Sequence, residues 1–444
     1  MADNIKLTQG PLKITYEVTL DLNGKVLEQS GADSVFVIGS EKTKERGKLT
    51  VVDSDTTREH KFKPNADHLW GLDETGGTKT VHGGIIYGGR ASSGGGVNVE
   101  NGTLIMEGGS IVGCRALNGQ TGSGSGGVYL ERDGKFTLEK GSIVGCRAGT
   151  YGGVYIKRGK MAMTGGEIAG CTAGQDPSTG LAGQDLSAGL YLGGGRLSAN
   201  GGTVKDEVFC VGTIDSAVGK SGCTEFQARV TNQKIATGGG WLDGLIRHGN
   251  FRGTVLNQNG GGIDGGTFLG DVENIDAHLG AGITGSGGTF YGKVTNGSKD
   301  GPAKSARIRG GTFRGEVINE KSGMISIGTF YEGIVDEGGE VRGHTVTYKI
   351  GETVYAQHAA AKGSGFYAEG NIEYWQCRDC GKYFADAKAA KEITRADTVI
   401  PAMGRPDRGE PVKAPGTGGA GIALYGVMAL LSLTGCAWLR RKKK

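Results

Sequence analysis

Short runs of alternating apolar and polar residues recur along most of the chain, separated by glycine or polar turns. This alternation has the period of two that is typical of β-strands with one buried face. Segments 94–116, 126–148 and 152–173 align position by position, and segment 188–204 follows less closely. Each segment contains three such runs, which predicts three short strands per repeat.

The apolar residues of the three repeats occupy equivalent positions in the alignment, which we call slots. In the third repeat the alternation places Tyr155, Lys157 and Ala162 on one side of the strands and the apolar residues on the other. The equivalent apolar residues, repeat by repeat, are Val97, Val99, Leu104, Met106 and Ile111; Val128, Leu130, Phe136, Leu138 and Ile143; and Val154, Ile156, Met161, Met163 and Ile168. One coil of a solenoid per repeat would stack equal slots about 4.8 Å apart. We therefore predict an all-β right-handed parallel β-helix rather than an up-and-down sandwich, whose hairpins would not produce this equivalence.

A second repeat with a Phe-x-Gly-x-Val core occupies residues 250–335. Its phenylalanines are spaced 17, 22, 23 and 17 residues apart, at Phe251, Phe268, Phe290, Phe313 and Phe330. We predict that they form a ladder inside shorter coils. The alternative is an external ladder that stacks against sugar rings.

The composition excludes several other classes of protein. Glycine supplies 88 of 444 residues without a Gly-X-Y period, so the chain is not collagen, and glycine at this frequency disfavours helical bundles. A hydrophobic fraction of 36% with a net charge of +4 disfavours disorder. Residues 440–444 carry five positive charges, so the other 439 residues sum to −1. We expect no nucleic-acid partner.

Cysteines supply the first candidate chemistry. Cys114, Cys146 and Cys171 share one slot in successive repeats, which predicts inward-facing thiols, with a disulfide between neighbours as the alternative. Cys210 and Cys223 fit no shared slot in the sequence alignment. No histidine flanks any of these cysteines to suggest a reactive role.

Cys377 and Cys380 form a C-x-x-C motif followed by glycine, which is the shape of one zinc knuckle. No second C-x-x-C motif supplies the remaining ligands, and His358 is the only histidine after position 344. Bound zinc, a Cys377–Cys380 disulfide and free thiols all stay open, and we expect no other cofactor. Residues 369–401 resemble a small repeat module in surface proteins of gut Firmicutes.

Carboxylates were compared with the groove sites of β-helical polysaccharide lyases and hydrolases, which need two or three converging acids. The candidates are the pairs Asp53 and Asp55, Asp264 and Asp271, and Glu107 and Glu139. None forms a convincing cluster, so we predict no catalytic residue and keep a carbohydrate-active enzyme as the alternative function.

The C-terminal segment has the pattern of an anchor. Residues 422–439 are 18 uncharged, largely apolar residues followed by the five cations, close to the length of about 20 that spans a bilayer. Upstream stand Ala414, Pro415, Gly416, Thr417 and Gly418. This arrangement resembles the cell-wall sorting signal (Leu-Pro-any-Thr-Gly) of Gram-positive surface proteins, with Ala414 in place of leucine. The resemblance implies cleavage after Thr417 by a sortase and attachment to peptidoglycan; membrane retention without cleavage is the alternative.

Residues 1–15 contain no signal peptide, so we expect the natural start to lie upstream. The expected organisation is N-terminal capping coils (1–80), β-helix repeats (81–343), a C-x-x-C module (344–401), a Pro/Gly-rich linker with the sorting motif (402–418) and a transmembrane anchor with a basic tail (419–444). The repeats resemble those of adhesin-like surface proteins. That resemblance implies a non-catalytic, cell-surface protein that binds host or neighbouring-cell glycans or matrix, with a passive spacer as a further alternative.

Overall fold

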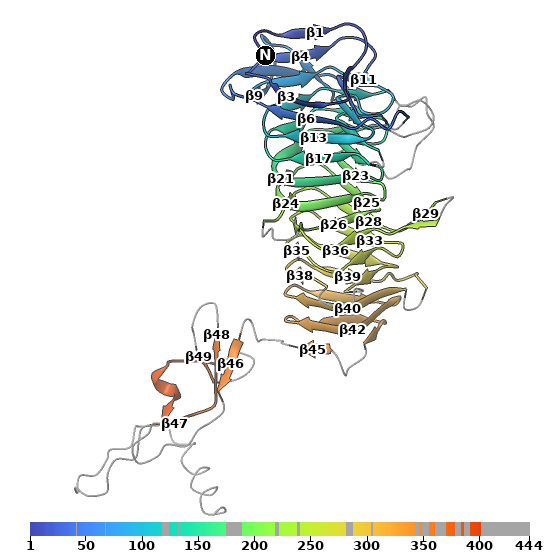
Figure 1. The fold of residues 1–444 in the computed structure, drawn as a ribbon. Helices are drawn as coiled ribbons and strands as arrows, with labels where there is room; N and C mark the ends of the chain where they lie inside the picture. Colours follow the sequence, from blue (N-terminus) through green and yellow to red (C-terminus); the bar gives the residue numbers. More distant parts are fainter. Residues whose placement is uncertain are drawn as a thin grey trace, which may run out of the picture. The chain divides into compact units, whose positions relative to one another are not determined.

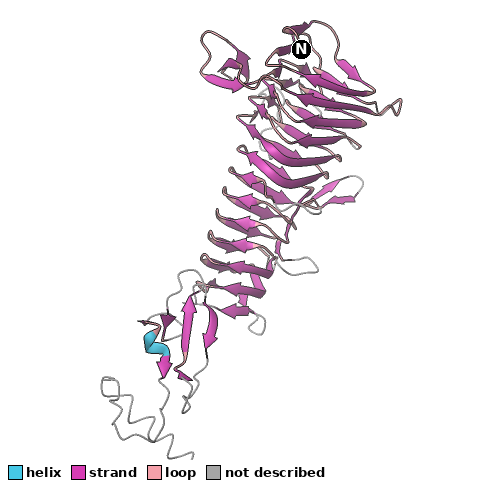
Figure 2. Ribbon diagram, turned by 60° about the vertical axis from the view of Figure 1, so that its left-hand side comes forward, coloured by secondary structure: helices cyan, strands magenta, loops and turns pink. Residues whose placement is uncertain are grey.

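The computed structural model describes residues 1–400, apart from 41, 67, 118–123, 132, 175–188, 218–221, 238–239, 281–286, 303–304, 342–345, 349–354, 360–369, 378–382 and 386–390. The chain forms two compact units, Met1–Thr353 and Val354–Lys444. The first unit is a β-solenoid whose strands lie one above another in successive coils (Figures 1 and 2). Its strands pair in parallel from coil to coil, as the sequence predicts; the right-handed sense of the coil stays a prediction.

Each coil crosses three faces, which we name in the order in which the chain meets them. Face 1 is a 13-stranded parallel sheet: β2 (Leu12–Ile14), β5 (Phe36–Ile38), β12 (Val97–Val99), β16 (Val128–Leu130), β20 (Val154–Ile156), β23 (Leu190–Leu192), β25 (Val208–Cys210), β28 (Val230–Gln233), β33 (Val255–Gln258), β36 (Val272–Ile275), β39 (Val294–Asn296), β41 (Val317–Glu320) and β43 (Ile334–Glu337).

Faces 2 and 3 belong to one 23-stranded sheet, because four long strands run through both: β21 (Lys160–Ala169), β24 (Arg196–Val204), β40 (Ala306–Phe313) and β42 (Gly323–Phe330). Face 2 also contains β3 (Glu17–Asp21), β6 (Gly47–Val52), β13 (Gly102–Met106), β17 (Lys135–Leu138), β26 (Thr213–Asp215), β31 (Leu245–Ile246), β34 (Gly262–Ile263), β37 (His278–Leu279) and β44 (Glu340–Val341). Face 3 also contains β1 (Ile5–Leu7), β4 (Val26–Gln29), β10 (Ile85–Tyr87), β14 (Ser110–Val112), β18 (Ser142–Val144), β27 (Glu225–Phe226), β32 (Asn250–Phe251), β35 (Thr267–Phe268), β38 (Thr289–Phe290) and β45 (Val346–Tyr348). Short strands β11 (Arg90–Ala91), β15 (Arg115–Ala116), β19 (Arg147–Ala148) and β22 (Thr172–Ala173) line the corner between faces 3 and 1.

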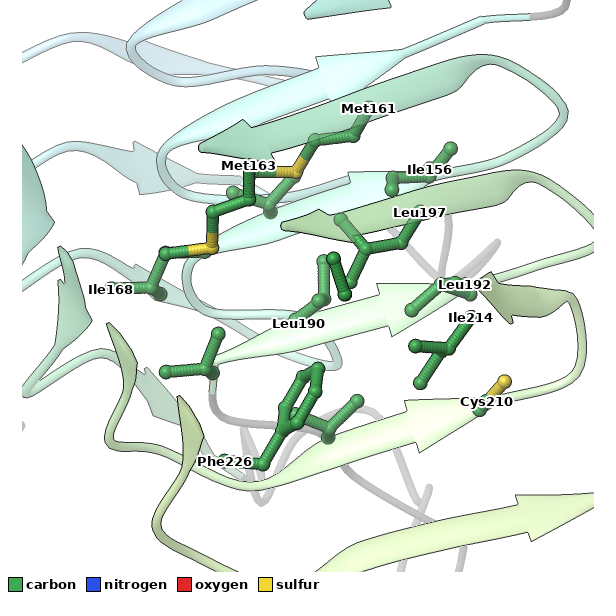
Figure 3. Packing of buried hydrophobic residues seen from close by; sticks show 14 of the residues in the cluster. Ile156, Met161, Met163, Ile168, Leu190, Leu192, Leu197, Cys210, Ile214 and Phe226 are labelled. Carbon is green, nitrogen blue, oxygen red and sulfur yellow. The ribbon is translucent and has the colours of Figure 1, made fainter. Parts of the chain in front are cut away.

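The slots predicted from the repeats are in register. Val97 pairs with Val128 and Val128 with Val154 on face 1, and Leu104 pairs with Phe136 on face 2. The apolar side chains of these slots are buried and point toward one another inside the coils, as Figure 3 shows for the stretch from Ile156 to Phe226. Stacking therefore buries an apolar face that a single coil could not bury alone.

The predicted phenylalanine ladder lies inside face 3. Its rings are 0% exposed and stack with centroids 4.7–4.8 Å apart and planes within 10° of parallel. Interior packing is thus confirmed, and the external sugar-stacking ladder is excluded for these residues. The structure adds Phe226 as a sixth member, which the sequence analysis missed because no Phe-x-Gly-x-Val motif surrounds it.

Inside face 1 the core changes chemistry along the solenoid. The third slot of each strand is aliphatic through Leu192, becomes Cys210, and is then asparagine in five successive coils. The expectation that Cys210 fits no shared slot was wrong, because it pairs with Leu192 and Asn232. The five amides are 0% exposed and hydrogen-bond to one another in series: Asn232, Asn257, Asn274, Asn296 and Asn319.

Within the described part of the solenoid, two insertions with strands of their own interrupt the coils, and neither was predicted. A three-stranded antiparallel flap, β7 (Glu59–Pro64), β8 (Trp70–Leu72) and β9 (Lys79–His82), packs on the outside of face 3. The backbone N–H of Trp70 donates a hydrogen bond to the Gly145 carbonyl (3.1 Å). Gly145 has a φ of +60°, and a Cβ added there would lie only 2.0 Å from the Trp70 indole, so the flap packs closely on this glycine. A hairpin, β29 (Ile235–Thr237) and β30 (Gly240–Leu242), projects between faces 1 and 2 (Figure 1).

The second unit contains an antiparallel sheet of β46 (Tyr355–Ala359), β48 (Tyr374–Cys377), β49 (Tyr383–Phe384) and β50 (Glu392–Ile393). Strands β47 (Gly370–Asn371) and β51 (Val399–Ile400) form a separate antiparallel pair. The 3₁₀ turn η1 (Ala396–Thr398) directly precedes β51. Within the described ranges no helix has the length and apolar character needed to cross a membrane. The predicted span at 422–439 lies outside those ranges, so it stays a prediction.

Candidate functional site

A polar pocket of about 360 Å³ opens on face 1 over strands β12 and β16. We call it the face 1 pocket and define it by its lining residues Lys42, Ser93, Asn98, Glu100 and Glu131. Every lining side chain is a hydrogen-bond donor or acceptor. The volume falls within the range of small-molecule sites, but the lining is far more polar than that of an average ligand pocket.

The solenoid register brings the two carboxylates of the face 1 pocket together. Val99 pairs with Leu130, and Glu100 and Glu131 directly follow these two residues, so they occupy one slot in adjacent coils. Like charges in adjacent coils repel unless each has partners. Glu131 accepts a hydrogen bond from the Tyr129 hydroxyl (2.8 Å) and pairs with the Lys157 ammonium (3.3 Å).

Asn98 leaves one hydrogen-bonding group unused in the face 1 pocket. Its amide nitrogen donates to Glu100 Oε1 (3.3 Å), whereas its Oδ1 is buried and has no hydrogen-bond partner. A buried acceptor without a donor costs about 1–3 kcal/mol. A ligand hydroxyl that reached Asn98 Oδ1 would recover that free energy, so the pocket is suited to a hydroxyl-bearing ligand.

An aromatic cluster continues from the face 1 pocket along the outside of face 1. Tyr129 pairs in register with Asn98 and contacts Tyr155, which contacts Tyr191, and Phe209 stacks on Tyr191. Hairpin residues Ile235 and Leu242 pack against this cluster. Burial raises the pKa of the Tyr155 and Tyr191 phenols, so both stay neutral at physiological pH. The cluster is a buried wall beside the pocket rather than an exposed platform.

A second polar hollow, of about 210 Å³, lies near the same corner of the solenoid. Its lining residues are Arg46, Gly47, Asn101, Gly102, Thr103, Asp133 and Lys135. The connection between β5 and β6 contributes to both hollows, with Lys42 in the face 1 pocket and Arg46 in the second. The corner therefore offers two adjoining groups of polar side chains from the same coils.

Two tyrosines and an arginine lie at the corner after face 3, several coils further along. Tyr291, Arg314 and Tyr331 each follow a phenylalanine of the interior ladder and so stack on the outside in successive coils. The Arg314 guanidinium lies 5.7 Å from the Tyr291 ring centroid and 4.8 Å from that of Tyr331. Tyr291 is 49% exposed, so its ring can stack on a planar or sugar surface.

The predicted thiol ladder is confirmed as interior and free. Cys114, Cys146 and Cys171 are at most 3% exposed and form no disulfide. Burial, reinforced by hydrogen bonds with Cys114 and Cys171, raises the pKa of the Cys146 thiol, and burial raises the pKa of Cys210 to about 12. These cysteines are packing residues.

The carboxylates singled out in the sequence hold turns instead of converging. Asp53 accepts hydrogen bonds from the backbone N–H groups of Gly24 (2.8 Å) and Gly84 (2.7 Å). Asp271 accepts from the Lys293 N–H (2.9 Å), and Asp264 lies 3.8 Å from the Arg247 guanidinium. Asp55 is half-buried and accepts hydrogen bonds from the Thr57 backbone N–H (3.1 Å) and the Thr57 hydroxyl (2.7 Å). Glu107 and Glu139 are exposed at the surface. Glu100 and Glu131 were missed, although they directly follow the first apolar run of the first two repeats.

The remaining predicted site residues, at the C-x-x-C motif and the sorting motif, cannot be compared with the structure. Cys377 ends β48, but its side chain, Cys380 and the sorting residues 414–418 lie outside the described part of the chain. Among the described residues no group of three or more His, Cys, Asp or Glu side chains could hold a metal ion. Zinc at the C-x-x-C motif therefore stays a prediction.

Comparison of the chain with protein-family models, with curated proteins and with solved structures finds no match.

Proposed function

We propose that the solenoid is a non-catalytic glycan-binding protein that displays the face 1 pocket at a cell surface. The observation that carries this proposal is the pocket itself: all five lining residues are polar, and one of them, Asn98, has a buried carboxamide oxygen that lacks a donor. A glycan presents many hydroxyl groups that both donate and accept hydrogen bonds. Lys42 can donate to such a ligand, Asn98 Oδ1 can accept from it, and Ser93 can do both.

We further propose that residues 402–444 attach this solenoid to the cell wall or membrane of a Gram-positive bacterium. The support is sequence pattern alone: the Ala414–Gly418 motif, the apolar stretch 422–439 and the terminal cations. Changing Thr417 to Ala in the native host is expected to release the chain from the peptidoglycan fraction if a sortase acts there. Unchanged wall attachment would contradict cleavage at this motif.

We predict that Glu131→Gln weakens glycan binding by about tenfold or more, because a charge-assisted hydrogen bond contributes about 1.5–3 kcal/mol. The ligand is first selected by exposing the purified full chain to an array of host and bacterial glycans. Its dissociation constant is then measured by calorimetry for the unchanged protein and the variant.

Glu273→Gln is the matched control for this prediction. Glu273 is an outward-facing, exposed carboxylate on face 1, in β36, and lies six strands away from β16. This control should bind as tightly as the unchanged protein. Equal weakening in both variants, or no glycan bound at all, would contradict a site at the face 1 pocket and favour a passive spacer.

The in-register carboxylates Glu100 and Glu131 support one second candidate, a polysaccharide-active enzyme of the same fold. Glycoside hydrolysis uses two carboxyl groups on either side of the scissile bond. Release of reducing ends from a bound glycan, abolished by Glu100→Gln and by Glu131→Gln, would replace the binding proposal by this one. Retention of the glycan without product supports the non-catalytic function.

A further inference from the structure

Cys223 and His248 form a side-chain pair that the sequence analysis missed. Cys223 Sγ lies 3.3 Å from His248 Nε2, and the same nitrogen lies 2.8 Å from the Gly222 carbonyl oxygen. A carbonyl oxygen only accepts hydrogen bonds, so Nε2 carries a proton. The nitrogen that carries this proton also lies within hydrogen-bond distance of the cysteine sulfur.

The pair is a product of the coil register. Glu225 pairs with Asn250 and Phe226 with Phe251, so counting back two residues places Cys223 and His248 in one slot of adjacent coils. The two residues are 25 positions apart in the chain, which is why no local motif reveals them. The expectation that Cys223 shares no slot was wrong.

Among the described residues, the two neighbouring coils place no side chain in the slot of this pair. By the same register, the slot holds Gly201 in the preceding coil and Gly265 in the following coil. Neither glycine has a side chain to cover the sulfur. Cys223 is half-buried, whereas the other described cysteines, in the ladder and at Cys210, are at most 3% exposed.

We propose that Cys223 is a modification site that undergoes thiol–disulfide exchange with small-molecule disulfides, and that the His248 N–H stabilises the attacking sulfur. The Cys223 thiolate attacks one sulfur of a disulfide R–S–S–R. A Cys223–S–S–R bond forms, the original S–S bond breaks, and the leaving thiolate takes up the proton that Cys223 released. Cys223 is oxidised and the leaving sulfur is reduced, so no further oxidant is needed.

The test is exposure of the full folded chain to oxidised glutathione, with each cysteine followed by peptide mass spectrometry. Cys223 is expected to gain the glutathione adduct while Cys114, Cys146, Cys171 and Cys210 remain thiols until denaturant is added. His248→Ala should slow the Cys223 reaction by about tenfold, the effect of losing one hydrogen bond to the reacting sulfur. His248→Gln, which keeps an N–H donor, should restore part of the rate.

Far-UV circular dichroism is the control for folding. Spectra of both His248 variants that match the spectrum of the unchanged chain would show that a slower reaction is not a consequence of unfolding. Adduct formation at Cys223 no faster than at Cys146 would overturn the proposal. An unchanged rate in His248→Ala would overturn the role of the histidine. A Cys223–Cys223 dimer that forms in place of the glutathione adduct would overturn the assignment of small disulfides as the substrate.

Discussion

Phe290→Ala is expected to lower the free energy of unfolding of the solenoid by about 3–5 kcal/mol, the range for deleting a buried aromatic ring. The Phe290 ring is 0% exposed and stacks on Phe268 at 4.7 Å and on Phe313 at 4.8 Å. The substitution therefore leaves a cavity and also removes two ring contacts. Because each coil contacts only its neighbours, the loss should be concentrated around β38. Urea unfolding measures the loss of free energy, and hydrogen exchange of the β38 amides shows whether the loss is local.

Tyr291→Ala is the matched control, since it removes an aromatic ring from the next residue on the outside of the same corner. Tyr291 is half-exposed and contacts the Arg314 guanidinium, which is worth about 0.5–1 kcal/mol at an exposed site. A loss in Phe290→Ala no larger than in this control would show that the ladder does not form the core of these coils.

Asn274→Leu is expected to cost about 3 kcal/mol, although it places an apolar side chain of similar size in a fully buried position. Asn274 accepts a hydrogen bond from Asn257 (2.8 Å) and donates to Asn296 (2.7 Å) and to the Ala277 carbonyl (3.2 Å). Leucine leaves the Asn296 carboxamide oxygen and the Ala277 carbonyl without these donors. Urea unfolding measures the cost.

Glu273→Leu introduces the same side chain on the adjacent, exposed position of β36 and should change stability by less than about 0.5 kcal/mol. Because the amides act in series, Asn274→Leu and Asn296→Leu combined should cost less than the sum of the single changes. Strict additivity would contradict a coupled amide ladder.

The fold was largely predictable because a solenoid repeats its packing in the sequence. Val97, Val128 and Val154 occupy equal positions in the alignment and also pair in space, so local alternation and global register give the same answer. The interior phenylalanines followed from the same logic. The flap could not be predicted, since its packing depends on Trp70 meeting glycines of three separate coils.

The site was less predictable because outward slots carry no uniform pattern. Glu100 and Glu131 occupy equivalent positions in adjacent coils, and Lys157 occupies that position in the next coil. Because the charge changes sign along this series, the alignment did not reveal that the two carboxylates are stacked. Four of the five buried asparagines stand two positions after the valine of a Phe-x-Gly-x-Val unit, and the sequence analysis did not single them out. The alternation alone gives no reason to bury an amide at that position, and only the hydrogen-bonded series explains its burial.

Hydrogen exchange of the full chain with and without the oligosaccharide selected on the array tests the binding claim most directly. We predict slower exchange of the amides in residues 93–101 and around Glu131 when the oligosaccharide is bound, and unchanged exchange in residues 250–335. Slower exchange confined to residues 250–335, or no difference anywhere along the solenoid, would contradict the assignment of the face 1 pocket.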